Sequence, residues 1–150
     1  MLYVANTPQP IAEELNGIKL LAIDVKLEAE LVELPEEQKR EYMKELGMKE
    51  SGLDRLTSSA YKLLNLITFI TAGPKETKAW TIIKGTKAPQ AAGVIHTDFE
   101  KGFIRAEIIA WDKLLEAGSY ATARDKGWLR VEGKEYIMQD GDVAHFRVNA

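Results

Sequence analysis

The sequence of 150 residues contains no cysteine and only two histidines. Without cysteine it has neither a disulfide framework nor thiolate chemistry, which fits a cytoplasmic protein. His96 and His145 are far apart in the chain and lack the spacing of metal ligands, so we predict no zinc site.

Long apolar runs are also missing. No stretch approaches the roughly 18 apolar residues that a membrane span requires, and no basic-then-apolar segment indicates a secretory signal. We therefore expect no membrane partner. Hydrophobic residues make up 45% of the chain and charged residues 29%. This is the composition of an ordinary globular protein with one good core, or one compact domain and an appendage.

The motifs of several enzyme classes are absent. Gly85-Thr86-Lys87 lacks the upstream glycine of a phosphate-binding loop, and Pro89 follows too soon for a phosphate-cradling helix start. No Gly-x-Ser-x-Gly, His-Glu-x-x-His or Gly-x-Gly-x-x-Gly is present. Asp140 and Asp142 flank a glycine, and we interpret them as turn formers. We expect no catalytic residues in this chain.

Charge is distributed unevenly along the chain. The formal net charge is −3. Residues 1–65 carry 8 Lys and Arg against 12 Asp and Glu, whereas residues 66–150 carry 12 against 11. The second half is therefore the better candidate for contact with a polyanion, although such contact must rest on local clusters of basic residues.

The N-terminal residues have the pattern of a parallel α/β fold. Leu2–Ala5 is apolar at successive positions, which predicts a strand buried on both faces. A short helix over Ile11–Asn16 and a second strand over Ile18–Val25 would complete a βαβ unit. Two strands cannot form a stable sheet alone, so we interpret this region as the remnant of a larger α/β domain.

Helices are predicted between residues 26 and 65. Leucines recur at helical spacing over Leu27–Leu34, and Pro35 opens a second helix that ends at Gly47. Ser51–Asp54 has the form of a capping box for a third helix. We interpret the leucine stripes as core.

From Leu66 the hydrophobic period changes to two. The expected strands are Ile67–Thr71, Thr77–Ile83, Phe103–Trp111, Trp128–Glu132, Glu135–Met138 and Val143–Val148. The expected helices are Gln90–Ile95, a short turn behind a capping box at Thr97–Glu100, and a helix from Ser119 through Lys126. This order favours an α+β, β-grasp (ubiquitin-like) domain over residues 66–150, preceded by residues 1–65 as the remnant of a larger α/β domain and connecting helices.

Basic and aromatic side chains are interleaved within residues 71–107. The alternation within Phe103–Trp111 places Phe103 on the same face as Arg105. Aromatic rings beside phosphate-seeking cations suit RNA, with Trp80 and Phe103 as candidate stacking surfaces. The predicted nucleic-acid-binding residues are Lys78, Trp80, Lys84, Lys87, His96, Lys101 and Arg105.

Several segments together resemble the C-terminal TGS domain of the YchF/Obg-like ATPase family. They are TAGP at 71–74, AWTI at 79–82, KGTKAPQAAG at 84–93, IHTDFEKGF at 95–103 and QDGDV at 139–143. KLEAEL at 26–31 is similar to the last motif of the family's G domain, and ESGLD at 50–54 precedes the TGS domain there too. The resemblance covers the chain from about Lys26 to the terminus.

The resemblance implies a protein of over twice this length, with a G domain, a coiled-coil insertion and a TGS domain, and it implies that the α/β remnant within residues 1–65 is the end of that G domain. It implies an ATPase that prefers ATP to GTP, uses magnesium and associates with ribosomes. Asn6 and Thr7 fall in the base-recognition motif and are the candidate cofactor-binding residues. The family has glutamate where this chain has Gln9. We expect no cofactor to bind this chain alone.

Three hypotheses follow. We favour an RNA- or ribosome-binding module, whose contact could be RNA or a ribosomal protein. A second hypothesis makes the chain part of a nucleotide hydrolase, to which it contributes the base pocket. A third is a ubiquitin-like protein-docking module. A sulfur carrier is disfavoured because such carriers end in Gly-Gly, whereas this chain ends in Asn149-Ala150.

Overall fold

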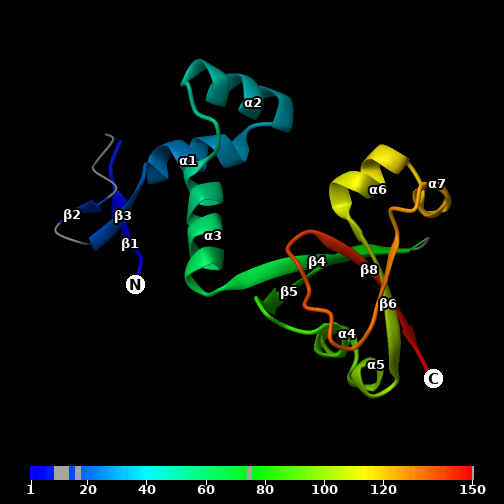
Figure 1. The fold of residues 1–150 in the computed structure, drawn as a ribbon. Helices are drawn as coiled ribbons and strands as arrows, with labels where there is room; N and C mark the ends of the chain where they lie inside the picture. Colours follow the sequence, from blue (N-terminus) through cyan, green and yellow to red (C-terminus); the bar gives the residue numbers. More distant parts are fainter. Residues whose placement is uncertain (9–13, 16–17, 74–75, 150) are drawn as a thin grey trace. The chain divides into compact units, whose positions relative to one another are not determined.

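A computed structural model of the chain describes residues 1–8, 14–15, 18–73 and 76–149 (Figure 1). The chain forms two compact units, Met1–Leu64 and Asn65–Ala150. Both units combine helices with strands, as the sequence predicts. The first contains a small sheet followed by helices, and the second contains a larger mixed sheet with helices against both of its faces.

The sheet of the first unit contains β1 (Tyr3–Asn6), β2 (Glu14–Leu15) and β3 (Ile18–Ile23). β3 lies between the others, parallel to β1 and antiparallel to β2. The predicted helix Ile11–Asn16 is wrong at Glu14–Leu15, and the rest of it lies outside the described residues. The sequence between β2 and β3 is Asn-Gly, the strongest short-range hairpin signal, and this signal outweighs a weak helical pattern.

Three helices follow in the described part of this unit: α1 (Val25–Glu33), α2 (Glu36–Glu45) and α3 (Gly52–Leu63). Asp24 caps α1 by accepting hydrogen bonds from two amides of its first turn. Pro35 is the N-cap of α2, and Gly47 follows that helix with φ +70°. The predicted capping box of α3 is confirmed, with Ser51 Oγ accepting from the Asp54 amide at 3.0 Å and the Asp54 carboxylate accepting from the Ser51 amide at 3.3 Å.

Burial in the first unit lies on β3 and α1 rather than on β1. Leu21, Ile23 and Leu31 are buried, whereas Tyr3 and Val4 are 45% and 49% exposed. The prediction of a first strand buried on both faces is therefore wrong for the described residues. Within them, β3 is the one strand paired with β1, and a parallel strand is buried on both sides only where helices cover both faces of its sheet.

Glu28 connects α1 to α3 inside the first unit. Its side chain is buried, and its two carboxylate oxygens accept hydrogen bonds from the amides of Gly52 at 2.6 Å and Leu53 at 3.2 Å. A negative charge is favourable at the N-terminus of a helix. A β-carbon on residue 52 would lie only 2.8 Å from Glu28 Oε1, so this approach requires glycine.

Replacing Glu28 with alanine should destabilise the start of α3 by about 1–3 kcal/mol, because the buried Gly52 amide and the partly buried Leu53 amide lose their acceptor. Amide hydrogen exchange at Gly52 and Leu53 should then accelerate about ten- to a hundredfold. Glu30→Ala, at an exposed position of α1, is the matched control and should leave exchange unchanged. Equal exchange in the two variants would contradict the capping role.

The sheet of the second unit contains β4 (Leu66–Ala72), β5 (Thr77–Ile83), β6 (Phe103–Ala110), β7 (Arg130–Glu132) and β8 (Asp142–Val148). Its order is β5-β4-β8-β6-β7. The β4–β5, β6–β7 and β6–β8 pairs are antiparallel, and the central β4–β8 pair is parallel, with Ile70 opposite Val143. The first and last strands of this unit therefore lie side by side.

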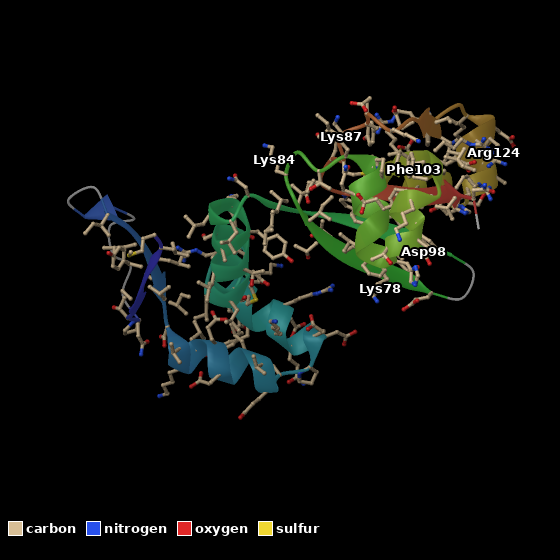
Figure 2. All side chains as sticks on the ribbon, turned by 90° about the horizontal axis from the view of Figure 1, so that it is seen from below. Lys78, Lys84, Lys87, Asp98, Phe103 and Arg124 are labelled. Atoms are coloured by element: carbon tan, nitrogen blue, oxygen red, sulfur yellow. The ribbon has the colours of Figure 1, made fainter. Side chains whose placement is uncertain are left out.

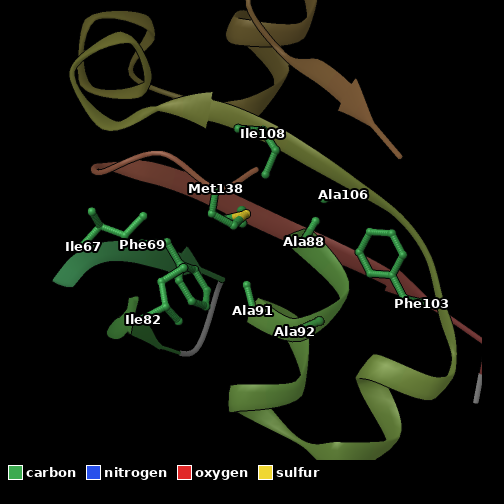
Figure 3. Close-up of a cluster of buried hydrophobic side chains, with 11 residues drawn as sticks. Ile67, Phe69, Ile82, Ala88, Ala91, Ala92, Phe103, Ala106, Ile108 and Met138 are labelled. Atoms are coloured by element: carbon green, nitrogen blue, oxygen red, sulfur yellow. The ribbon is translucent and has the colours of Figure 1, made fainter. Parts of the chain in front are cut away.

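The helices of this unit are α4 (Ala88–Ile95), α5 (Thr97–Lys101), α6 (Trp111–Ala117) and α7 (Tyr120–Asp125). One sheet face packs against α4, whose small residues Ala88, Ala91 and Ala92 are fully buried (Figure 3). Small side chains let the helix approach the sheet closely. The rest of this core comprises Ile67, Phe69, Ile82, Phe103, Ala106, Ile108, Met138 and Ala144.

The opposite face carries a second, smaller core. Ile109 of β6 and Val143 of β8 pack there with Ala123 of α7, and Leu114 of α6 is in contact with them. The sequence missed α6, because it predicted a strand through Trp111. The strand ends at Ala110 instead. None of the helices in the described ranges is long and apolar enough to cross a membrane.

Two further local predictions are wrong. α5 is capped by His96 rather than Thr97, because His96 Nδ1 accepts a hydrogen bond from the Asp98 amide at 3.3 Å. The segment Glu135–Met138 is not a strand and makes a single bridge, between Ile137 and Lys87. It instead places the side chain of Met138 in the core beneath α4.

Candidate nucleic-acid interface

Asn6 and Thr7, the predicted base-contacting residues, lie at the carboxyl end of β1. The side-chain oxygen of Asn6 accepts a hydrogen bond from the Val25 amide at 3.2 Å, and the Thr7 amide donates to the Ile23 carbonyl at 3.0 Å. Both residues therefore join the ends of the two parallel strands to the start of α1. Open α/β sheets bind ligands at this edge, so the position suits a nucleotide contact.

Lys78 and Trp80 lie on one face of β5. Lys78 Nζ is 4.2 Å from the centroid of the Trp80 ring, a cation–π contact. The indole nitrogen donates to Thr71 Oγ1 at 2.9 Å, and the ring stacks on Phe69 with centroids 6.4 Å apart. Trp80 thus forms the edge of the core, and a nucleobase that stacks on its outer face would displace Lys78.

An apolar groove opens beside Trp80, with a volume of about 610 Å³. Its lining includes Trp80 of β5, Ile95 of α4, Phe99 of α5 and Phe146 of β8. The groove provides aromatic surface next to Lys78, which is consistent with contact to an unstacked base.

Lys84 and Lys87 lie at the other end of β5 (Figure 2). Lys84 directly follows the strand and is exposed, whereas Lys87 is the N-cap residue of α4 and pairs with Glu135, with 2.5 Å between Nζ and Oε2. A strand rises about 3.3 Å per residue, so about 20 Å separate Lys78 from Lys84. Lys78 and these two lysines do not form one cluster.

His96 and Lys101 lie on the α4–α5 side of the sheet. His96 is occupied as the cap of α5, with its Nδ1 3.6 Å from a carboxylate oxygen of Asp98. Lys101 is exposed in the last turn of α5, and Glu100 precedes it in the same turn. The two acidic residues offset the positive charge of this region.

Arg105 lies on the opposite face of the sheet from α4. The pairing of β6 with β8 shifts register between Phe103 and Arg105, and such a bulge breaks the alternation of side chains. Phe103 consequently enters the core, with 4% of its surface exposed. The prediction that Phe103 shares a face with Arg105 is wrong, and this ring is not available for stacking on RNA.

Arg105 belongs to a group of three arginines around the buried Glu107. Its Nη2 is 3.9 Å from Glu107 Oε1, Arg147 Nε is 3.4 Å from the same oxygen, and Arg124 Nη2 is 3.3 Å from Oε2. The sequence missed Arg124 and Arg147, which lie 17 and 40 positions from Glu107. The period of two in β8 is the one local signal that places Arg147 on an outward face.

A second buried carboxylate, Asp142, is held differently. Its Oδ2 accepts hydrogen bonds from the Tyr136 hydroxyl and the Gln139 amide, both at 2.8 Å. Arg130 lies 3.6 Å from Oδ1 and donates to the Tyr136 hydroxyl at 3.0 Å. Burial, together with the hydrogen bond to Asp142, raises the pKa of Tyr136 to about 12, so Tyr136 acts as a donor that stays protonated.

The raised pKa of Tyr136 predicts loss of stability at alkaline pH. The unfolded phenol ionises near its ordinary pKa of 10.0, whereas the folded phenol keeps its proton to about pH 12. Its contribution is therefore complete below pH 10 and is lost as the pH rises to about 12. The free energy of unfolding, measured with urea at each pH, should fall over this range.

In Tyr136→Phe, the free energy of unfolding should fall less steeply between pH 10 and pH 12 than in the parent chain. At neutral pH the substitution should cost about 1.5–3 kcal/mol, because a buried carboxylate loses a donor. Tyr42→Phe, in the other unit, is the control and should keep the parental pH dependence. An unchanged alkaline fall in Tyr136→Phe would refute the assignment.

The predicted nucleic-acid residues thus occupy separate places rather than one surface. Figure 2 shows Lys78 apart from Lys84 and Lys87, and Arg124 apart from all three. In the part of the chain that the structure describes, the arginines around Glu107 are the one group whose guanidinium groups gather at a single side chain. Among the described residues, no three His, Cys, Asp or Glu side chains gather as metal ligands.

Comparisons with known proteins agree with the resemblance. Residues 66–149 match the family model YchF-GTPase_C, described as "Protein of unknown function (DUF933)". The chain is 45% identical over 164 residues to "Ribosome-binding ATPase YchF" of Bacillus subtilis, which covers 99% of this chain and 45% of that protein. It is 51% identical over 139 residues to the protein of the same name from Pasteurella multocida, with 93% and 38% covered.

A solved structure has the same fold over most of the chain. The YchF GTPase of Schizosaccharomyces pombe superposes with a TM-score of 0.77 at 43% identity, covering 87% of this chain and 34% of that one. The chain therefore spans less than half the length of these relatives.

Proposed function

The chain belongs to the YchF family, and on this basis we propose that residues 66–150 form a β-grasp TGS domain that binds RNA on the ribosome. The observation that carries the proposal is the extent of the match. A relative named as ribosome-binding is 45% identical over 99% of this chain, so both units have counterparts in that protein.

The strand order of the second unit supports the β-grasp assignment. The hairpin β4–β5 leads into α4, which packs across one face of the sheet, and the last strand returns to pair in parallel with the first. A helix packed across a sheet whose first and last strands are parallel neighbours is what a β-grasp domain would have. The hairpin and the helix occur in the predicted order, and the later strands follow without the predicted strand Glu135–Met138.

The surface chemistry of the second unit supports RNA as the partner. Lys84, Lys101 and Arg105 are exposed, and phosphates attract such cations without a requirement for sequence. The groove beside Trp80 adds apolar surface for a base. A ribosomal partner implies that the protein acts in the cytoplasm. If the partner is a ribosomal protein instead of RNA, Lys84, Lys101 and Arg105 would make that contact.

Binding to RNA should depend steeply on salt. Co-sedimentation of the chain with ribosomes should be clear at low ionic strength and weaken as salt is added, with a slope of log affinity against log salt of about 0.7 for each cation that contacts a phosphate of single-stranded RNA. Sedimentation that is absent at low salt, or indifferent to salt, would refute RNA binding.

The double variant Lys84→Gln/Lys101→Gln tests whether the second unit makes the contact. It should bind more weakly and reduce the salt slope by about 0.7 for each lysine that contacts a phosphate. Lys44→Gln/Lys49→Gln changes the same net charge at exposed positions of the first unit and is the matched control, expected to bind like the parent chain.

The first unit has a second, nucleotide-related role in this proposal. Its parallel strands, with Asn6 and Thr7 at their carboxyl end, would supply part of the base pocket in the longer relatives. Those proteins are named as ATPases, and their other segments would hold the phosphates of ATP or GTP and the magnesium ion. This chain would then act as a regulatory binding module without catalysis of its own.

The isolated chain should neither bind ATP measurably nor hydrolyse it, because its sequence has no loop to cradle phosphates. Calorimetric titration with magnesium and ATP should give no heat beyond dilution. Saturable binding, lost in Asn6→Ala, would show instead that the base pocket suffices for affinity.

A further inference from the structure

The three arginines around Glu107 come from three different elements. Arg105 lies on β6, Arg147 on β8 and Arg124 on α7, and each has its guanidinium within 4.0 Å of a Glu107 oxygen. Glu107 itself is 8% exposed. Because the sheet and α7 all carry these contacts, the arginines are held in place on the sheet face opposite α4.

Positive charge exceeds negative charge in this group. Among the described residues, Glu107 is the one carboxylate within 4.0 Å of the three arginines, so two positive charges remain uncompensated. Arg105 and Arg147 are direct cross-strand partners, and like charges in that relation repel each other. A second anion on this face would relieve that repulsion.

The guanidinium groups also have unused hydrogen-bonding capacity. Their distances to Glu107, 3.3–3.9 Å, exceed the 2.7–2.9 Å of a strong charged hydrogen bond. The side chains of Arg105, Arg124 and Arg147 are 50%, 64% and 47% exposed. Since each guanidinium has five N–H donors, Glu107 engages only a few of them.

The neighbouring side chains favour a nucleic acid over a simple anion. His145 of β8 and Val131 of β7 are both directly opposite Glu107 in the sheet, and both are exposed. Directly paired residues share a sheet face. An imidazole and an apolar side chain beside the arginines offer a stacking surface and a contact for ribose.

We propose that Arg105, Arg124 and Arg147 form a phosphate-binding surface for the RNA backbone, on the sheet face opposite α4. The planar fork of arginine fits phosphate oxygens in a bidentate manner, and Glu107 positions the three forks. This inference rests on the proposed RNA-binding function and adds to it a second contact, apart from the lysines and Trp80.

The test measures binding of the full chain to a fluorescent oligouridylate at several salt concentrations. Arg147→Gln should weaken binding about tenfold, because a charged hydrogen bond to phosphate is lost, and lower the salt slope by about 0.7. Arg147→Lys keeps the positive charge but loses the planar guanidinium. Its affinity for the oligonucleotide should lie between that of the parent chain and that of Arg147→Gln. Lys134→Gln, at an exposed position outside this surface, is the control for charge alone and should bind like the parent chain.

Glu107→Gln gives the decisive comparison. It keeps a side-chain oxygen that can accept hydrogen bonds from the arginines but removes the negative charge that competes with phosphate, so RNA binding should tighten even where the melting temperature falls. Arginines that only stabilise the fold would give weaker or equal binding in this variant. Thermal melting followed by circular dichroism checks that each variant is folded.

The outcomes separate this inference from the proposed function. If the parent chain binds RNA and neither Arg147→Gln nor Glu107→Gln changes the affinity, the arginine surface is refuted and RNA binding stands. If the parent chain binds neither oligouridylate nor ribosomes at low salt, both proposals fail. If polyglutamate binds through Arg147 and oligouridylate does not, the partner of this surface is an acidic protein and the RNA assignment is overturned.

Discussion

The placement of β8 between β4 and β6 is the constraint on which the second unit depends. β8 pairs in parallel with β4 and antiparallel with β6, so it joins the β4–β5 pair and the β6–β7 pair into one sheet. Its inward side chains, Ala144 and Phe146, complete the core under α4, and Val143 completes the core under α7. The outward residues include Arg147, which reaches Glu107 only because β8 lies beside β6.

The two buried carboxylates of this unit differ in how they are satisfied. Asp142 accepts two hydrogen bonds at 2.8 Å from a hydroxyl and an amide. Its Oδ2 atom is therefore fully used within the fold. Glu107 has longer contacts to three half-exposed arginines. A buried charge is costly unless it is fully paired, and here the excess lies with the cations. The first acid therefore stabilises a turn, while the second organises a basic surface.

Sequence reasoning found individual basic residues but not their grouping. Lys78, Lys84 and Lys87 are close in sequence, yet β5 is extended and separates the first from the other two along its length. Phe103 and Arg105 were expected on one face, but a bulge places the ring in the core. Arg124 and Arg147 lie in segments without any motif, so periodicity alone could not join them to Arg105.

The amino-acid sequence by itself determined most of the local elements and the family. The Ser51 capping box, Gly47 after α2 and the strands Leu66–Ala72 and Thr77–Ile83 follow from propensities that act within a few residues. Tertiary structure alone decided the parallel β4–β8 pair, the burial of Met138 and the meeting of three arginines at Glu107. These depend on contacts between residues far apart in the chain, whose free energy arises only when the whole sheet forms.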